Sequence, residues 1–237
     1  MKKEVQINFK DFEAKGLYLI FPDGGRLELT RASIEQSVDV FWRDPARIPE
    51  HVKKASEFQK CAICPLREQQ GMCHAIRPTM PFLDIVDRYV SYDEVIAVFK
   101  REQDLLHVSA TTMQKALEFV SILSLIYFCE TGKAYWKYFY GINPLMDLQE
   151  IACRFYLNLF FLHTGDQEEI NRVISKFKDE ITITSQNQAA RLNMVCKNDA
   201  FLNAFANTQI TSLILSMDME EVLKKSFDKF EQARTIK

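Results

Sequence analysis

The chain of 237 residues is poor in the residues that build turn-rich folds, with only seven glycines and seven prolines. This scarcity favours helices with short connections over a turn-rich β architecture. The chain also lacks an excess of charge of either sign, because 30 Lys and Arg stand against 32 Asp and Glu. A net charge of −2 gives no overall attraction to nucleic acid or to an anionic membrane.

Long apolar runs are also missing. The two longest, residues 119–129 and 151–162, are far shorter than the about 20 residues that a membrane-spanning helix needs. No apolar stretch follows the two lysines at residues 2 and 3, so we expect no signal peptide and a cytosolic protein with reduced thiols. Six cysteines are too few for a disulfide scaffold, and their local clustering indicates metal or redox chemistry.

What the chain does contain begins with β-like runs at residues 16–21 and 26–30, which flank the turn signal PDGG and predict a small antiparallel sheet. Residues 41–54 predict a connector that becomes a helix after Pro49. Residues 80–90 predict a helix, and residues 93–100 fit either a strand or the end of a helical hairpin. From Ser109 onward the pattern predicts only helices, over 109–132, 144–165, 166–181 and two later segments.

These elements predict an α+β protein dominated by helices. A small N-terminal antiparallel sheet and a Cys-rich knuckle would pack on a C-terminal helical bundle. We expect residues 1–237 to form a single compact unit. Its parts would be the sheet and connector (1–60), the knuckle with linking elements (61–108) and the bundle (109–237).

The candidate metal centre lies at residues 61–74, CAICPLREQQGMCH. Cys61 and Cys64 are spaced so that both thiolates can bind one ion from a tight turn, and Cys73 adds a third. A structural zinc site or an iron–sulfur cluster needs four ligands. We predict zinc, with an iron–sulfur cluster as the alternative. Four residues are candidates for the fourth ligand: His74, Cys129, His51 and His107.

Two further features carry hypotheses. The aromatic segment 133–141, KAYWKYFYG, predicts a packed cover on the end of the bundle, although base stacking or a partner interface would use the same residues. The polar residues in the apolar helices predict either an exposed salt bridge with a helix cap, or a buried network or anion site centred on Arg154. In the second case Arg154 is at least half buried. The residues of this polar site are Glu150, Arg154, Arg191, Asp199 and Asn203.

The stretches CAICPL, SYDEV and NDAFLNA resemble those of a family of uncharacterised bacterial proteins. Its members share Cys-x2-Cys-Pro-Leu, a third Cys soon after and a late Asp-Ala-x-x-Asn-Ala helix, and the resemblance implies no activity. The family has a further Cys in a Ser-Gly-Cys-Pro stretch, where this chain reads TGKA at 131–134, and Pro where this chain has His74. Either His74 or Cys129 replaces the family's fourth ligand, or the site has been lost.

The sequence therefore predicts a non-enzymatic cytosolic protein whose Cys-rich site, holding zinc, joins the N-terminal half to the helices. Its role would be to bind a protein partner or a small ligand, and self-association into a homo-oligomer stays open. The alternative is a redox or metal sensor that uses an iron–sulfur cluster or reactive thiols.

Overall fold

The structure is a computed structural model that describes residues 7–46, 48–82, 88–101, 105–144 and 146–195, together with Lys224 and Asp228. It has an α+β fold in which helices predominate, as the sequence predicts. Here η denotes a 3₁₀ or π-helical segment. The elements in chain order are η1 (Phe9–Asp11), β1 (Gly16–Ile20), β2 (Arg26–Thr30), α1 (Arg31–Arg43), α2 (Glu50–Glu57), η2 (His74–Phe82), β3 (Glu94–Lys100), β4 (Leu106–Thr112), α3 (Met113–Leu123), η5 (Ser124–Phe128), η6 (Gly132–Phe139), α4 (Leu148–Leu162) and α5 (Gln167–Leu192).

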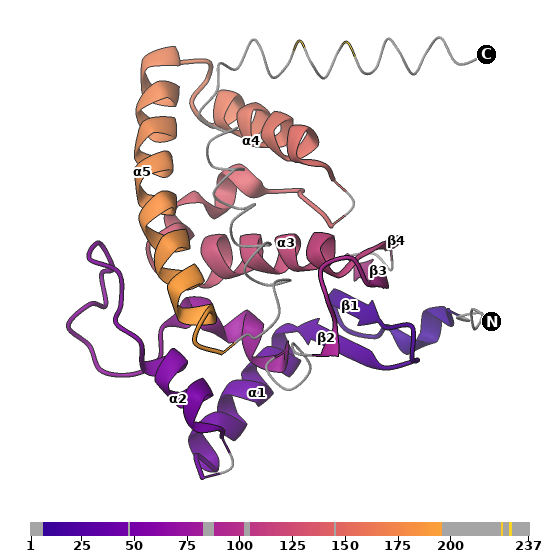
Figure 1. Ribbon diagram of the computed structural model, residues 1–237. Coiled ribbons are helices and arrows are strands. Elements are labelled where there is room, and N and C mark those ends of the chain that lie inside the picture. Colours follow the sequence, from indigo (N-terminus) through magenta and orange to yellow (C-terminus); the bar gives the residue numbers. More distant parts are fainter. Residues whose placement is uncertain are drawn as a thin grey trace, which may run out of the picture.

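The sheet has four antiparallel strands in the order β2-β1-β3-β4, so two hairpins lie side by side (Figure 1). Strands β1 and β2 confirm the predicted N-terminal hairpin, and β3 shows that residues 93–100 form a strand. Strand β4 corrects the prediction that helix begins at Ser109. The β-branched residues Val108, Thr111 and Thr112 pair with β3, and the helix starts only at Met113.

Helix α1 is not among the predicted elements. It begins with a capping box, in which Thr30 Oγ1 accepts a hydrogen bond from the Ser33 N–H while Ser33 Oγ accepts one from the Thr30 N–H. Its buried residues Ile34, Val38 and Phe41 are four and three positions apart, which places them on one face against the core. Helix α2 then starts directly after Pro49, as predicted.

The helix predicted over residues 109–132 is shorter than expected. Helix α3 passes into the π-helical turn η5, and the chain leaves helical geometry at Cys129. Gly132 is therefore not the C-cap of this helix but the first residue of η6. The predicted aromatic cover lies in η6: Tyr135, Tyr138 and Phe139 are buried, while two other aromatic side chains of the segment are exposed.

Helices α4 and α5 follow one another across a short turn, and each begins after an Asp residue. Asp147 caps α4, and the Asp166 carboxylate accepts hydrogen bonds from the backbone N–H groups of Glu168 and Glu169 at the start of α5. Helix α5 continues without a break through residues 182–192, so it is longer than the helix predicted over 166–181. The first of the two later predicted helices begins at Ser185, within α5, and apart from its described part and from Lys224 and Asp228 the two lie outside the described residues.

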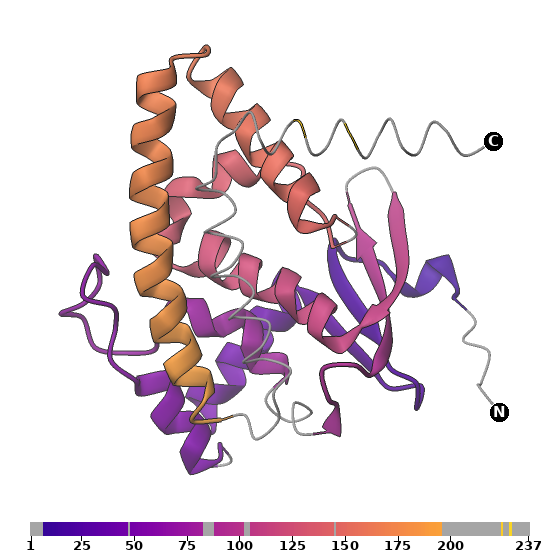
Figure 2. The ribbon, with the colours of Figure 1, turned by 45° about the horizontal axis from the view of Figure 1, so that its top comes forward.

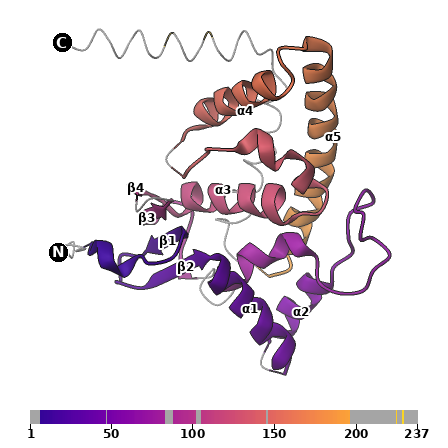
Figure 3. The same cartoon turned by 180° about the vertical axis from the view of Figure 1, so that it is seen from behind.

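Helix α5 runs along one side of the molecule, and the sheet lies on the other side (Figures 1 and 3). The main hydrophobic core fills the space between them, from Leu17 and Leu19 of β1 to Phe155 of α4 and Phe177 of α5. The loop that carries the first cysteines emerges beside the C-terminal half of α5 (Figure 2). This loop and α5 form the walls of the candidate site.

Candidate metal centre

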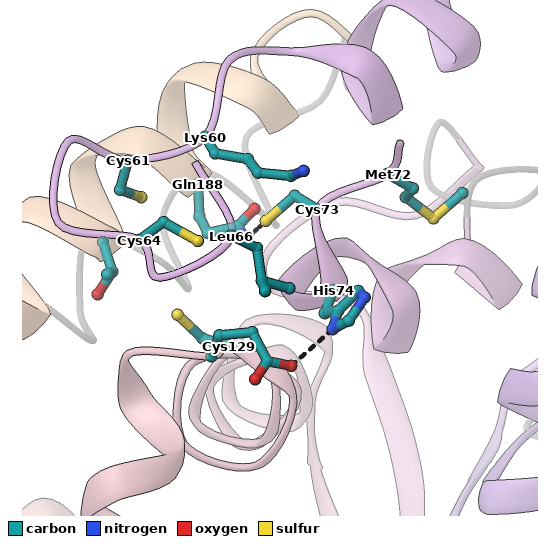
Figure 4. A pocket seen from close by; sticks show the side chains of 11 residues that line it. Lys60, Cys61, Cys64, Leu66, Met72, Cys73, His74, Cys129 and Gln188 are labelled. Atoms are coloured by element: carbon teal, nitrogen blue, oxygen red, sulfur yellow. Dashed lines mark hydrogen bonds and ion pairs between the residues drawn. The ribbon is translucent and has the colours of Figure 1, made fainter. Parts of the chain in front are cut away.

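Four cysteines from three separate parts of the chain line one pocket. Cys61 and Cys64 lie in the loop after α2, Cys73 directly precedes η2, and Cys129 directly follows η5. Figure 4 shows their sulfur atoms turned toward a common space between these segments. The structure thus brings the three clustered cysteines together with two of the candidates for the fourth ligand, Cys129 and His74.

The loop that carries Cys61 and Cys64 consists of successive tight turns. The backbone N–H of Cys64 donates to the carbonyl of Cys61 at 2.9 Å, and the N–H of Arg67 donates to the carbonyl of Cys64 at 3.0 Å. Thr131 Oγ1 donates to the carbonyl of Ile63 at 3.5 Å. This contact joins the knuckle to the turn that follows Cys129.

The position of Cys129 depends on the π-helical turn before it. Its N–H donates to the carbonyl of Ser124 at 2.9 Å, which is the five-residue spacing of a π-helix. The chain then turns sharply, and Gly132 packs directly against the preceding helix. A Cβ at Gly132 would lie 1.6 Å from the carbonyl oxygen of Leu125, so only glycine fits there.

Three of the four cysteines, Cys61, Cys73 and Cys129, are buried, and burial controls the acidity of two of them. Burial raises the pKa of Cys61 to about 12, with smaller contributions from the neighbouring Cys129, Cys73 and Cys64, while the charge of Arg191 acts in the opposite direction. Burial likewise raises the pKa of Cys129, although the backbone N–H groups of Thr131 and Gly132 partly offset it. These two thiols are therefore neutral at pH 7 unless a cation replaces their protons.

Two kinds of N–H donor already point at the sulfur atoms. Gln188 Nε2, on α5, donates to Cys73 Sγ at 3.6 Å. The backbone N–H groups of Thr131 and Gly132 are directed at Cys129. Donors of this kind stabilise the thiolate more than the thiol. The thiolate is the state in which cysteine binds a metal.

His74 lies in the pocket wall but is engaged elsewhere. Its Nδ1 forms a hydrogen bond with Glu130 Oε1 at 2.6 Å (Figure 4). Lys133 Nζ binds the same oxygen at 2.5 Å. The pocket does not include the other two histidine candidates. His51 is exposed on α2, and His107 lies on β4 opposite Phe99. Cys129 is thus the candidate that the geometry favours.

The cavity between the cysteines has a volume of about 20 Å³, which is room for one water-sized occupant. Within the described ranges, no three His, Cys, Asp or Glu side chains are arranged so that they could hold a metal ion as they stand. Binding would therefore need the cysteine side chains to turn further inward. All four thiols are free and not paired in disulfides, so they can turn.

The predicted polar site is not assembled by the described residues. The Glu150 carboxylate accepts a hydrogen bond from the Asp147 N–H at 2.7 Å and forms no ion pair with Arg154, which is exposed. Arg191 lies at the C-terminal end of α5, at the other end of the molecule from α4 (Figures 1 and 3). Asp199 and Asn203 lie outside the described residues, so a contact between Arg154 and Asp199 stays a prediction.

The fold and pocket define a mainly helical α+β protein with four cysteines around one small cavity. Comparisons with known protein families, with curated proteins and with solved structures find no match. The resemblance to a bacterial family therefore stays a prediction. No helix in the part of the chain that the structure describes is long and apolar enough to cross a membrane.

Proposed function

We propose that this chain is a non-enzymatic cytosolic protein in which Cys61, Cys64, Cys73 and Cys129 bind one structural zinc ion. The observation that carries the proposal is the convergence of four free cysteines from three chain segments on one pocket. Zinc favours four thiolates in a closed tetrahedral site when its role is structural. The small cavity suits a single ion better than a larger group.

Such an ion would hold the knuckle against the helices. The loop between α2 and η2 has no regular secondary structure, and only its turns and a few side-chain bonds tie it down. Bonds from one ion to residues on both sides of this loop and to the end of η5 would fix it in place. In sites of this kind the binding energy of the metal is largely folding energy.

The working role that we propose is the binding of a protein partner or a small ligand, with a second copy of the chain among the candidate partners. Exposed aromatic side chains on η6 and α4 support it: Trp136, Tyr140, Phe160 and Phe161. Asn158 of α4 donates to the carbonyls of Tyr138 and Tyr140, so the two elements are held together on this side. Aromatic residues are enriched where proteins bind one another.

Elemental analysis of the purified chain tests the proposal, together with variants of single cysteines. We expect one equivalent of zinc in the colourless wild-type protein, and loss of both the zinc and thermal stability in Cys61→Ser and Cys129→Ser. Cys153→Ser is the matched control, because Cys153 is on α4 and does not line the pocket. The proposal fails if the wild-type protein has no metal and all three variants melt alike.

An iron–sulfur cluster is the second candidate, in a redox or metal sensor. It is supported by the same four free cysteines around one pocket, because four cysteine thiolates are also the usual ligands of such a cluster. If the protein purified without oxygen is brown and contains iron and sulfide, the four cysteines bind this cluster and not zinc.

A further inference from the structure

Arg191 is a fully buried cation without a carboxylate partner among the described residues. Its side chain is 0% exposed, yet its Nε and Nη1 atoms have no hydrogen-bond partner among the described residues. In the same part of the chain its Nη2 donates to neutral oxygens, the carbonyls of Phe58 and Gln59 at 3.2 Å and Oδ1 of Asn187 at 3.3 Å. A guanidinium cannot lose its proton to escape this situation, so its burial has a large cost in free energy.

Arg191 binds the chain directly before the first cysteine of the pocket. The two backbone carbonyls that it binds belong to the residues just before the knuckle, and its guanidinium also lies 5.7 Å from the ring of Phe58. Arg191 is therefore held beside the first ligand of the proposed centre.

Helix α5 presents a second polar group to the same pocket. Gln188 is one helical turn before Arg191, so both side chains lie on one face of α5. Gln188 donates to Cys73 Sγ, while Arg191 lies beside Cys61. Both residues are buried, at 2% and 0% exposure. This face of α5 thus offers an N–H donor and a positive charge to two different ligands.

The charge of the proposed centre matches this environment. Four thiolates around a divalent ion leave two surplus negative charges, and four thiolates around an oxidised four-iron cluster leave the same surplus. A buried anion of this kind needs a nearby cation, because desolvation of an uncompensated charge is costly. Arg191 is a buried cation that needs an anion.

We propose that Arg191 is the charge partner of the four-cysteine centre, a positioning residue that makes the pocket selective for a metal–thiolate group with a net negative charge. The inference rests on the proposed function, since it requires that the four cysteines bind a metal. It predicts that the charge of residue 191 matters more to metal binding than its hydrogen bonds to the loop.

The test is a titration of the metal-free full chain with Co²⁺ in competition with a chelator, read from the absorption of the cobalt–thiolate bonds. Arg191→Lys keeps the charge and loses the planar fork, whereas Arg191→Gln loses the charge and keeps an N–H donor. We expect Gln to weaken Co²⁺ binding about 10- to 100-fold, and Lys to stay close to wild type. Arg172→Gln, on the exposed side of α5, is the control and should bind like wild type.

Four results would overturn the inference. If Arg191→Gln binds Co²⁺ as tightly as wild type, or if Lys and Gln weaken binding equally, Arg191 acts only through its hydrogen bonds and the metal proposal itself stands. If the wild-type chain binds no Co²⁺, both proposals fail. If Arg191→Gln does not fold, the rise in melting temperature on adding Co²⁺ to Arg191→Lys decides: it should match the wild-type rise, and a smaller rise contradicts the inference.

Discussion

At the scale of single residues, Gly132 is the glycine at which an added side chain has the least room. A Cβ there would meet the backbone carbonyl of Leu125 at 1.6 Å, and backbone cannot move aside as a side chain can. We expect Gly132→Ala to cost more than about 3 kcal/mol, which lowers the melting temperature by about 6–12 °C in a chain of this size. Thermal unfolding followed by circular dichroism measures it.

Gly71 provides the contrast, because it lies in the cysteine loop with a φ of +105° and has no atom within 4 Å of an added Cβ. Its replacement by Ala therefore costs backbone strain without a clash, which amounts to about 1 kcal/mol. Gly132→Ala should be clearly the worse variant. Equal melting temperatures would mean that the turn after Cys129 can open, and that this cysteine is not held in place by its backbone.

The sequence predicts part of the candidate site at this scale. The spacing of Cys61, Cys64 and Cys73 is enough to indicate a centre, because they are close along the chain. Cys129 stays one candidate among several, since only the tertiary fold brings it to the pocket. The prediction assigns Arg191 to a polar site around Arg154 and does not single out Gln188, because polar residues three apart on a helix look like a solvent-exposed face and nothing in the sequence connects them to the cysteines.

At the scale of elements, helix α4 carries a test of the predicted polar site. The Glu150 carboxylate and the Asp147 carboxylate cap each other's backbone N–H groups, and Glu150 forms no ion pair with Arg154. We expect Glu150→Ala to lose about 0.5–1 kcal/mol of stability through the lost capping box, and Arg154→Ala to be nearly neutral.

The double variant distinguishes the cap from an ion pair. If Glu150 acts as a cap, the two losses add to within about 0.3–0.5 kcal/mol in urea unfolding of the single and double variants. A larger coupling energy between Glu150 and Arg154 would support the predicted ion pair on the helix face. A second double variant, with Arg172→Ala in place of Arg154→Ala, provides the comparison, because Arg172 is an exposed cation unrelated to Glu150.

Helix α1 and strand β4 differ most from the prediction, and they do so for different reasons. Helix α1 has a capping residue at Thr30 and buried residues Ile34, Val38 and Phe41 at helical spacing, so its signal was present in the sequence. Strand β4 is different. Its alternation of exposed and half-buried residues is weak, and its pairing with β3 decides its conformation.

At the scale of the whole molecule, helix α5 connects two regions that are distant in the fold. Near its start, His163 and Glu169 lie beside Tyr138 of the aromatic core, with the Tyr138 hydroxyl 2.9 Å from His163 Nε2. At its other end, the Gln188 and Arg191 side chains face the cysteine pocket. A structural change at the pocket can therefore affect the aromatic core through one rigid helix. Loss of the proposed metal should then change the structure beyond the loop.

Removal of the metal should loosen the cysteine loop before the rest of the molecule unfolds. The described chain holds this loop by turns, by Thr131 and by the bonds of Arg191 to Phe58 and Gln59. Proteolysis of a briefly opened segment follows the population of its open form. After treatment with a chelator, trypsin should cleave after Lys60 and Arg67 about tenfold faster or more, while cleavage after Lys54, within α2, changes little.

Peptide mapping by mass spectrometry measures both rates in one experiment, so Lys54 acts as an internal control for unfolding of the whole chain. Cys129→Ser should show the fast cleavage without a chelator, because it lacks one of the bonds that fix the loop. Cys153→Ser should stay slow until metal is removed. If the loop is cut at the same rate with and without chelator, the turns alone hold it, and a metal at the four cysteines has no structural role.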